Sequence, residues 1–459
     1  MQDIDLSVIL GEHVARARFE HLSEGAIEGA RKTILDTVGV CLAASGQEPA
    51  ARAVVDLARE SGGREESTIL GFGGRVPAMM AALANGALAH CLDYDDQTPW
   101  GQHAASSLVP ATLALAERRG GVSGRDLLTA VAIGQDLFNR MRVAIDWRKD
   151  WNFSTVGGVF SATAAAAAVL RLPADRVANA LGIASMQCAG TAEVLNATGS
   201  DLRALYAGFS AKGAVLACSL AERGTSGVPT LFEGQFGIMN MYFGGRYDRG
   251  SMLDGLGERF TGGLTLYKRW PCVGTAHSHI HAMIELVTEH DLVPDDIAEI
   301  RVHVGDYHQL MSEPIEARRA PDTLVDAKFS LPFLVAVAAV KRDVQLADFT
   351  RDALRDPAVM DAARKVIPVI DPALDWKQDL PPGRIELLMN DGRRFCRVGK
   401  NVPGNADSPM TWTDIVRKFG DCARSAAIPV TYDRIERVVS LAQTIETLPD
   451  VTELVRAVS

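Results

Sequence analysis

Alanine-rich apolar segments dominate the first 260 residues of the chain and are separated by clusters of Gly, Pro and Ser. Alanine favours the helix, and side chains this small let neighbouring helix backbones approach closely. The run 162–168 is so apolar and small that it predicts burial between other helices. We therefore expect an all-α helical bundle of two layers, with helices over 79–92, 108–118, 161–170 and 204–223.

The helical pattern of apolar residues gives way to strand patterns after Thr265. Residues 297–304 alternate apolar and polar side chains, as in a half-buried strand. Residues 384–390 and 393–398 flank Asp391-Gly392, a dipeptide that suits a tight hairpin turn. Helical patterns over 279–289 and 331–341 lie among these strands, so this region is predicted to be a smaller α+β domain.

The tail from Trp412 returns to a helical pattern whose apolar positions need a partner surface, and the first helical region is the obvious one. The expected fold is therefore mainly α. We expect residues 1–264 and 403–459 to form a helical main domain and residues 265–402 to form an inserted, smaller α+β domain.

Composition narrows the class of protein. The chain has 459 residues, 47% of them hydrophobic and 23% charged, which is typical of a soluble globular protein. A formal net charge of -10 disfavours nucleic acid or an anionic membrane as a partner. Seven cysteines without a C-x-x-C pair indicate a reducing compartment, and the acidic N-terminus does not resemble a secretory signal, so we expect a cytoplasmic protein.

The most informative segment runs from His90 through Asp93, Asp95 and Asp96 to His103. Three carboxylates and two imidazoles at the end of an apolar helix are costly unless they are hydrogen-bonded or used. They could simply cap a following segment or face water. Asp93 could instead orient His103 and raise its basicity, which predicts an active site. A hard-metal site at Asp95 and Asp96 is a third possibility, although no further carboxylate spacing supports it.

The sequence offers two further candidate sites. His277, His279 and His281 would share one face on a strand and could then bind zinc, but the following residues continue as a helix, which favours a capping or substrate-facing role for His277 and no metal. Lys268 lies at the domain boundary, where its ammonium could hold a carboxylate or belong to a solvated basic turn.

No nucleotide-binding or serine-hydrolase motif is found. The glycine-rich stretch 71–74 lacks the spacing of a phosphate loop and is predicted to be a turn. These observations favour chemistry without a cofactor.

The chain resembles the MmgE/PrpD family over nearly its whole length. This family includes dehydratases of 2-methylcitrate, decarboxylases of cis-aconitate and an epimerase of iminodisuccinate. The motifs that carry the resemblance are Ile34 to Gly39, Ala84-Asn85-Gly86, His90-x-x-Asp93-Tyr94-Asp95-Asp96, His103, Ala180 to Ala184, Lys268-x-x-Pro271, His277 and Asp326 to Pro332.

The resemblance implies a helical domain with an inserted lid, a homodimer, and a pocket between the domains for a small di- or tricarboxylic acid. By this resemblance the pocket is lined by Asp93, His103, Lys268 and His277. It also implies that no metal and no organic cofactor takes part.

Departures from the family pattern bear on the reaction. Asn152 stands where relatives commonly carry a histidine, and Arg203 and Tyr206 stand where a lysine and a histidine are usual. Arg203 can still clamp a carboxylate bidentately, but the groups available for proton transfer have changed.

We therefore hypothesise proton transfer at the carbon next to a carboxylate, with His103, held by Asp93, as the base. Lys268 and Arg203 bind the anion, and His277 or Tyr206 is the opposing acid. Further candidate substrate contacts are Asn152, Asp96 and Thr98. Loss of water (a dehydratase) is the expected outcome, epimerisation and decarboxylation are alternatives, and a non-catalytic carboxylate-binding relic is another.

Overall fold

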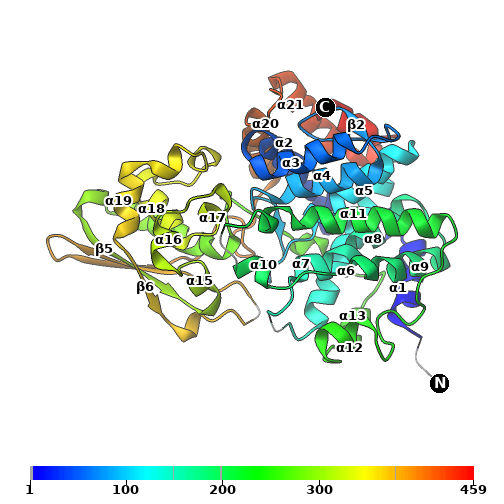
Figure 1. The fold of residues 1–459 in the computed structure, drawn as a ribbon, viewed down its shortest axis with the longest axis horizontal. Coiled ribbons are helices and arrows are strands. Elements are labelled where there is room, and N and C mark those ends of the chain that lie inside the picture. The colour runs from blue at the N-terminus through cyan, green and yellow to red at the C-terminus, as the bar shows by residue number, and fades with distance from the viewer. Residues whose placement is uncertain (1–3, 148, 197–198, 378, 459) are drawn as a thin grey trace.

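The structure is a computed structural model that describes residues 4–147, 149–196, 199–377 and 379–458. It is mainly α-helical, as the sequence predicts, and its sheets are small. Figure 1 shows the helices of the N-terminal half gathered on one side, with the C-terminal helices beside α2 and α3, and the largest sheet on the other side.

The N-terminal region is built mainly from helices. They are α1 (Leu6–Arg16), α2 (Glu24–Gln47), α3 (Pro49–Glu60), α4 (Ala78–His90), α5 (Ala105–Arg119), α6 (Gly124–Ala144), α7 (Phe153–Val156), α8 (Gly158–Val169), α9 (Ala174–Ala184), α10 (Glu193–Asn196), α11 (Leu202–Glu222), α12 (Ile238–Phe243) and α13 (Arg249–Leu253). The glycine-rich stretch 71–74 is the turn between strands β1 (Ser67–Thr68) and β2 (Arg75–Val76), as expected.

Helices α4 and α11 pack closely, and two glycines make this possible. A Cβ atom on Gly86 would lie 2.7 Å from Gly208 Cα, and one on Gly208 would lie 2.4 Å from the carbonyl oxygen of Leu83. Any larger side chain would push the helices apart. This contact matters for the site, because α4 ends at His90 and α11 carries Arg203 and Tyr206.

Helix α11 is also long and apolar enough to cross a membrane by length and composition, the one such helix among the described residues. However, 67% of its apolar window is buried inside the protein. The core helix of a soluble protein meets the same criterion, so this feature is weak evidence for a membrane span.

The C-terminal helices α20 (Trp412–Arg424), α21 (Tyr432–Gln443) and α22 (Thr452–Val458) return to the helical region. Helix α20 packs on α2, and the buried Lys418 of α20 lies 2.7 Å from the buried Asp36 of α2. The apolar positions noted in the tail thus find a partner surface, since Ile415, Phe419 and Val438 are fully buried.

The region between α13 and α20 contains a four-stranded sheet of order β6-β5-β7-β8. Its strands are β5 (Ile297–Val304), β6 (Val366–Ile370), β7 (Arg384–Met389) and β8 (Arg394–Val398), with β5 and β6 parallel and the other pairs antiparallel. The helices of this region are α14 (His277–Glu289), α15 (Asp306–Leu310), α16 (Ile315–Arg319), α17 (Leu324–Lys328), α18 (Leu331–Lys341) and α19 (Pro357–Arg364). Helices α14 and α18 pack against each other and against the sheet.

Two very short strands were not expected from the sequence. Strand β3 (Asp96–Gln97) pairs antiparallel with β4 (Leu266–Tyr267), so that Asp96 lies opposite Tyr267. Two-residue strands far apart in the chain leave no periodic pattern to detect. Their pairing places Lys268, the next residue after β4, beside the acidic segment that follows α4.

Candidate active site

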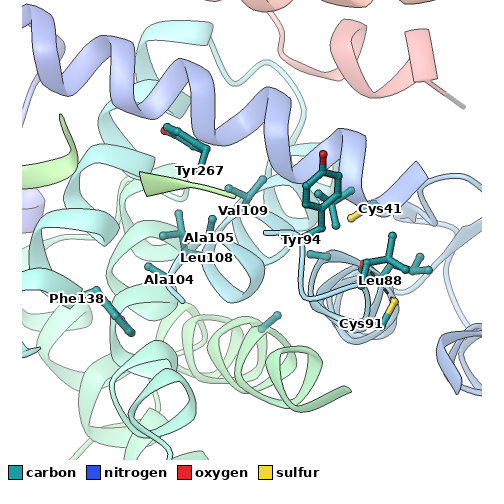
Figure 2. Packing of buried hydrophobic residues seen from close by; sticks show 14 of the residues in the cluster. Cys41, Leu88, Cys91, Tyr94, Ala104, Ala105, Leu108, Val109, Phe138 and Tyr267 are labelled. Carbon is teal, nitrogen blue, oxygen red and sulfur yellow. Dashed lines mark hydrogen bonds between the residues drawn. The ribbon is translucent and has the colours of Figure 1, made fainter. Parts of the chain in front are cut away.

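The acidic segment connects the end of α4 to the start of α5, and apolar residues anchor it at both ends. Figure 2 shows Leu88, Cys91 and Tyr94 near the α4 end of this segment and Ala104 and Ala105 at its α5 end, all packed in the core. Asp93 adopts a left-handed backbone conformation with φ of 48°, which Asp tolerates better than most residues. The segment is therefore a fixed turn that can present its carboxylates inward.

Each of two buried carboxylates in this turn has its own partner. Lys268 Nζ donates to Asp93 Oδ1 at 2.7 Å and to the Asp93 carbonyl oxygen at 2.8 Å. His90 Nδ1 lies 2.9 Å from Asp95 Oδ2. Lys268 Nζ is also 4.0 Å from Asp95 Oδ1. These contacts balance charges that would otherwise be costly to bury.

His103 lies against both carboxylates, but its orientation differs from the prediction. Its Nδ1 donates to the backbone carbonyl oxygen of Asp96 at 2.5 Å, and its Nε2 lies 3.7 Å from Asp93 Oδ1. Because a carbonyl only accepts, Nδ1 must carry the hydrogen and Nε2 the lone pair. The prediction that Asp93 sets the tautomer of His103 was therefore wrong, because the backbone carbonyl of Asp96 sets it. The Asp93 carboxylate is instead paired with Lys268.

Burial and neighbouring charges set the protonation of these groups. Burial lowers the pKa of His103 to about 4 and outweighs the attraction of the Asp95 carboxylate, so the ring is neutral near pH 7. Burial alone would raise the pKa of Asp95, but His103 and His90 hold it below its ordinary value. Burial likewise opposes ionisation of Asp93, and Lys268 and His103 hold its pKa below the ordinary value. Burial raises the pKa of Tyr206 well above 10, so its hydroxyl keeps its proton.

A cavity of about 40 Å³ adjoins these groups, between the helical region and the sheet-containing region. Of the predicted site residues, the cavity is lined by Asp93, His103, Asn152, Arg203 and Tyr206. The sheet-containing region contributes Val273, Gly274, Thr275, Tyr307, Phe329 and Trp376. Ligand pockets commonly measure about 300–1,000 Å³, so this cavity is smaller than most of them.

Other predicted site residues lie outside this lining. Lys268 is fully buried behind Asp93 and does not line the cavity, so it is neither a direct substrate contact nor part of a solvated turn. His277 begins α14 and is buried, with its Nε2 3.1 Å from the carbonyl oxygen of Trp270. Burial lowers the pKa of His277 to about 3. The direct roles predicted for these two side chains are not supported by their positions.

Asp96 and Thr98 were predicted to bind substrate, but they stabilise the turn instead. Asp96 Oδ1 accepts from the backbone N–H of Ala105 at 3.1 Å, and Thr98 Oγ1 accepts from that of Trp100 at 3.2 Å. Both residues are buried and neither lines the cavity. Local hydrogen bonds of this kind are the usual role of Asp and Thr in turns.

Several lining residues were predicted no catalytic or binding role. His90 belongs to the acidic segment that the sequence marks, and its ring lies 4.3 Å from that of Tyr206. Trp376 had no signal in the sequence. It contacts Tyr307 and Trp147 edge-on, with ring centroids 4.8 and 5.4 Å away, and these contacts exist only after folding.

A metal site is geometrically conceivable at this turn. Ligand atoms of His90, Asp93, Asp95 and His103 lie within 4.8 Å of one another, the only such group found among the described residues. The donor set fits a metal poorly, however, because the Lys268 ammonium is 2.7 Å from Asp93 and 4.0 Å from Asp95 and would repel a second cation. Both imidazoles also use Nδ1 in hydrogen bonds within the turn.

Removal of divalent metals is therefore expected to leave the protein unchanged. Dialysis against a chelator should shift neither the melting temperature nor the turnover number, because Lys268 already supplies the positive charge between the carboxylates. The melting temperature and the activity are measured before and after dialysis. Samples with added Zn²⁺ or Mn²⁺ serve as the comparison. Loss of activity that one metal restores would contradict it.

Comparisons with known proteins agree with the resemblance drawn from the motifs. The family model of the MmgE/PrpD N-terminal domain matches residues 8–249, and that of the MmgE/PrpD C-terminal domain matches residues 270–443. The cis-aconitate decarboxylase-like protein oryM of Aspergillus oryzae is 27% identical, with 94% of this chain and 93% of that protein covered. The cis-aconitate decarboxylases of Mus musculus and Homo sapiens are each 25% identical, covering 96% and 95% of this chain and 90% of each relative.

These matches extend over both the helical region and the sheet-containing region that enclose the cavity. Together the two family models contain the motifs from which the resemblance was drawn, except Lys268, which lies between the two matched ranges. The chain belongs to the MmgE/PrpD family.

Proposed function

We propose that this protein is a lyase that removes a proton from the carbon next to a carboxylate of a small hydroxy di- or tricarboxylic acid and releases water. The observation that carries this proposal is the state of His103. Its Nδ1 hydrogen is committed to the Asp96 carbonyl, and its Nε2 lone pair is left for a substrate at the cavity. A neutral imidazole with a free Nε2 is suited to act as a general base.

The surroundings of His103 favour transfer of the substrate proton to its Nε2. Once Nε2 takes the proton, the imidazolium lies 3.7 Å from Asp93 and 3.5 Å from Asp95, two carboxylates that stabilise the new charge. Lys268 acts through Asp93, because it holds the carboxylate and the carbonyl of that residue in place.

Tyr206 is a better candidate than His277 for the acid that protonates the leaving group. Its hydroxyl stays protonated and lines the cavity, whereas His277 does not line it. In the proposed step the C–H electrons form the carbon–carbon double bond while the C–O bond breaks. The departing hydroxide receives a proton from Tyr206 and leaves as water.

Decarboxylation of an unsaturated tricarboxylic acid is the second candidate. It is favoured by the relatives, which are named cis-aconitate decarboxylases. That reaction requires a proton to be delivered to carbon as CO₂ leaves, and Nε2 of the neutral His103 carries none. By the resemblance, Asn152 and Arg203 also replace the histidine and the lysine that are usual in the family at these positions.

The test is to incubate the protein in deuterated water with citrate, malate, 2-methylcitrate and cis-aconitate, and to follow each acid by NMR. Dehydration gives a new alkene signal from a hydroxy acid. Decarboxylation gives CO₂ and a methylene signal from cis-aconitate and would favour the second candidate. Deuterium exchange without net conversion would indicate an epimerase, and binding without exchange would indicate a non-catalytic relic. Either of these results would overturn the proposed lyase.

The pH dependence of the reaction follows from the lowered pKa of His103. The neutral base is lost as pH falls through about 4, so kcat/KM should stay level from pH 8 to about pH 5. An ordinary histidine base would lose half its activity near pH 6.5. The measurement is kcat/KM against pH, with circular dichroism showing that the protein stays folded. An acidic limb near pH 6.5 would show that His103 is not the base in the state described.

The dimeric state and the cytoplasmic location inferred from the sequence stay predictions, as does the absence of an organic cofactor.

A further inference from the structure

Buried lysines converge on the acidic turn from three separate parts of the chain. Lys268, Lys328 and Lys418 are 0%, 1% and 4% exposed, and they are the only buried lysines among the described residues. Lys268 follows β4, Lys328 ends α17 in the sheet-containing region, and Lys418 lies in α20. Lysine is almost never fully buried unless its ammonium is paired, so three at one place need an explanation.

All three ammonium groups donate to backbone carbonyl oxygens of one four-residue stretch. Lys328 Nζ donates to the Cys91 carbonyl oxygen at 3.1 Å, and Lys418 Nζ donates to that of Tyr94 at 2.6 Å. The carbonyl oxygen of Asp93, which lies between them, accepts from the third buried lysine at 2.8 Å. Three of the four carbonyls in this stretch are therefore held by lysines that are far apart in the sequence.

A charge partner occupies only part of each ammonium. Lys328 Nζ lies 2.6 Å from Glu48 Oε2, Lys418 Nζ lies 2.7 Å from Asp36 Oδ1, and both carboxylates are buried. An ammonium has three N–H donors, so one carboxylate does not use them all. Because both lysines direct a further donor to the same stretch of backbone, their role extends beyond ion pairing.

The stretch that the lysines hold carries the groups that act on His103. Asp93 has a φ of 48°, a sparsely populated conformation that persists only where the surrounding structure fixes it. Its Oδ1 lies 3.7 Å from His103 Nε2, and Asp95 Oδ2 in the same turn lies 3.5 Å from His103 Nδ1. A misplacement of about 1 Å at reacting groups costs about a hundredfold in rate, so the path of this backbone matters for the reaction.

We propose that Lys328 and Lys418 are positioning residues for the reaction at His103: together with Lys268 they hold the turn so that its carboxylates face the imidazole. This inference rests on the proposed function, because it takes His103 as the base. Neither lysine lines the cavity, so each acts through the turn and not on the substrate. Lys328 belongs to the sheet-containing region, so both regions that enclose the cavity contribute to holding the turn.

Paired substitutions separate positioning from ion pairing. Lys328→Met leaves the Glu48 carboxylate buried without its partner, whereas Lys328→Met combined with Glu48→Gln removes both charges and still leaves the Cys91 carbonyl without its donor. The double variant should regain most of the melting temperature lost in Lys328→Met. Its kcat on the acid identified by NMR should still be about 10- to 100-fold below the wild type. Lys418→Met with Asp36→Asn is the second such double variant.

Two further measurements respond to positioning and not to stability. Propane-1,2,3-tricarboxylate has neither a hydroxyl group nor a double bond and so cannot react. Its dissociation constant, measured by calorimetry, should change less than about threefold in the double variants, because the lysines lie outside the cavity lining.

The second measurement is an NMR titration of the histidine rings, in which His103→Asn assigns the signals of His103. Burial lowers the pKa of His103 to about 4, so the wild-type ring should stay neutral down to about pH 5. In the double variants the loosened turn admits water, and the pKa should rise above about 5 toward the ordinary value of a histidine. Each double variant removes one positive and one negative charge, so the net charge near the ring is unchanged.

Arg140→Met with Asp136→Asn is the matched control. This pair is also buried, with Arg140 Nε 2.6 Å from Asp136 Oδ2, and the guanidinium also donates to backbone carbonyls. Those carbonyls belong to residues 252–259, outside the acidic turn, and neither side chain lines the cavity. The control should leave kcat and the pKa of His103 unchanged.

A kcat within about twofold of the wild type in the double variants would overturn the proposal, as would an equal fall in the control. A tenfold loss of affinity for the inert acid would also overturn it, because the lysines would then act on the substrate. If one double variant does not fold, the other decides. If no hydroxy acid reacts with the wild type, the proposed function falls, and the pKa of His103 then decides the positioning: an unchanged pKa in the double variants overturns it.

Discussion

Replacing His103 with asparagine should lower kcat by about 10²- to 10⁴-fold, the range over which a positioned general base contributes. The asparagine NH₂ group can still donate to the Asp96 carbonyl oxygen that now accepts from Nδ1, so the turn should keep its shape. The base itself, the Nε2 lone pair beside Asp93, is lost. Steady-state kinetics on the acid identified by NMR gives kcat, and thermal melting shows whether the fold persists.

His290→Asn is the matched control, because this histidine lies on the surface at the end of α14, with 34% of its side chain exposed, and does not line the cavity. It should leave kcat unchanged. Calorimetry with propane-1,2,3-tricarboxylate should show that His103→Asn still binds the acid. If His103→Asn keeps more than about a tenth of the wild-type kcat, another group takes the proton and the proposed mechanism is wrong.

Replacing Lys268 with methionine should destabilise the protein by about 3–5 kcal/mol, the cost of removing one partner of a buried ion pair. Lys268 is fully buried, and Asp93 would keep its charge in the interior without a partner. The pKa of Asp93, now held below its ordinary value by Lys268 against the effect of burial, would then rise above the unfolded value. The penalty should therefore be smaller at pH 5 than at pH 8, because the unpaired Asp93 takes up a proton as pH falls.

The free energy of unfolding in urea at both pH values measures this effect. The neighbouring Arg269→Met is the matched control: Arg269 is 44% exposed and 3.4 Å from Asp343, so its loss should cost about 1 kcal/mol or less. The double variant Lys268→Met, Asp93→Asn should recover much of the stability but little activity. Equal losses in Lys268→Met and Arg269→Met would show that the buried pair does not stabilise the turn.

Local patterns predicted the regular elements well. Residues 297–304 and 331–341 form β5 and α18 with the predicted bounds, because alternation and a continuous apolar run are local signals of strand and buried helix. The alanine-rich helices also exist, with ends shifted by one to three residues. Helix ends are less predictable since they depend on caps and on neighbouring contacts, as with His277, which is already helical although the pattern suggested a start at 279.

The site was only partly predictable. Asp93 and His103 lie ten positions apart in one turn, so local spacing was enough to bring them together. The tautomer of His103 depends on a carbonyl oxygen, which every residue carries and no sequence pattern marks. The side chain of Lys268 was expected to contact the substrate, but the pairing of β3 with β4 turns it inward to Asp93.

The sequence by itself determined the mainly helical fold, the family and the segment that carries the candidate chemistry, because these depend on residue identity and short-range periodicity. Tertiary structure decided which groups reach the cavity. Asp96 and His277 are excluded from its lining, while Gln102 and Trp376 are included. The physical reason is that burial, long-range hydrogen bonds and the partner of each charge exist only once distant segments have packed together.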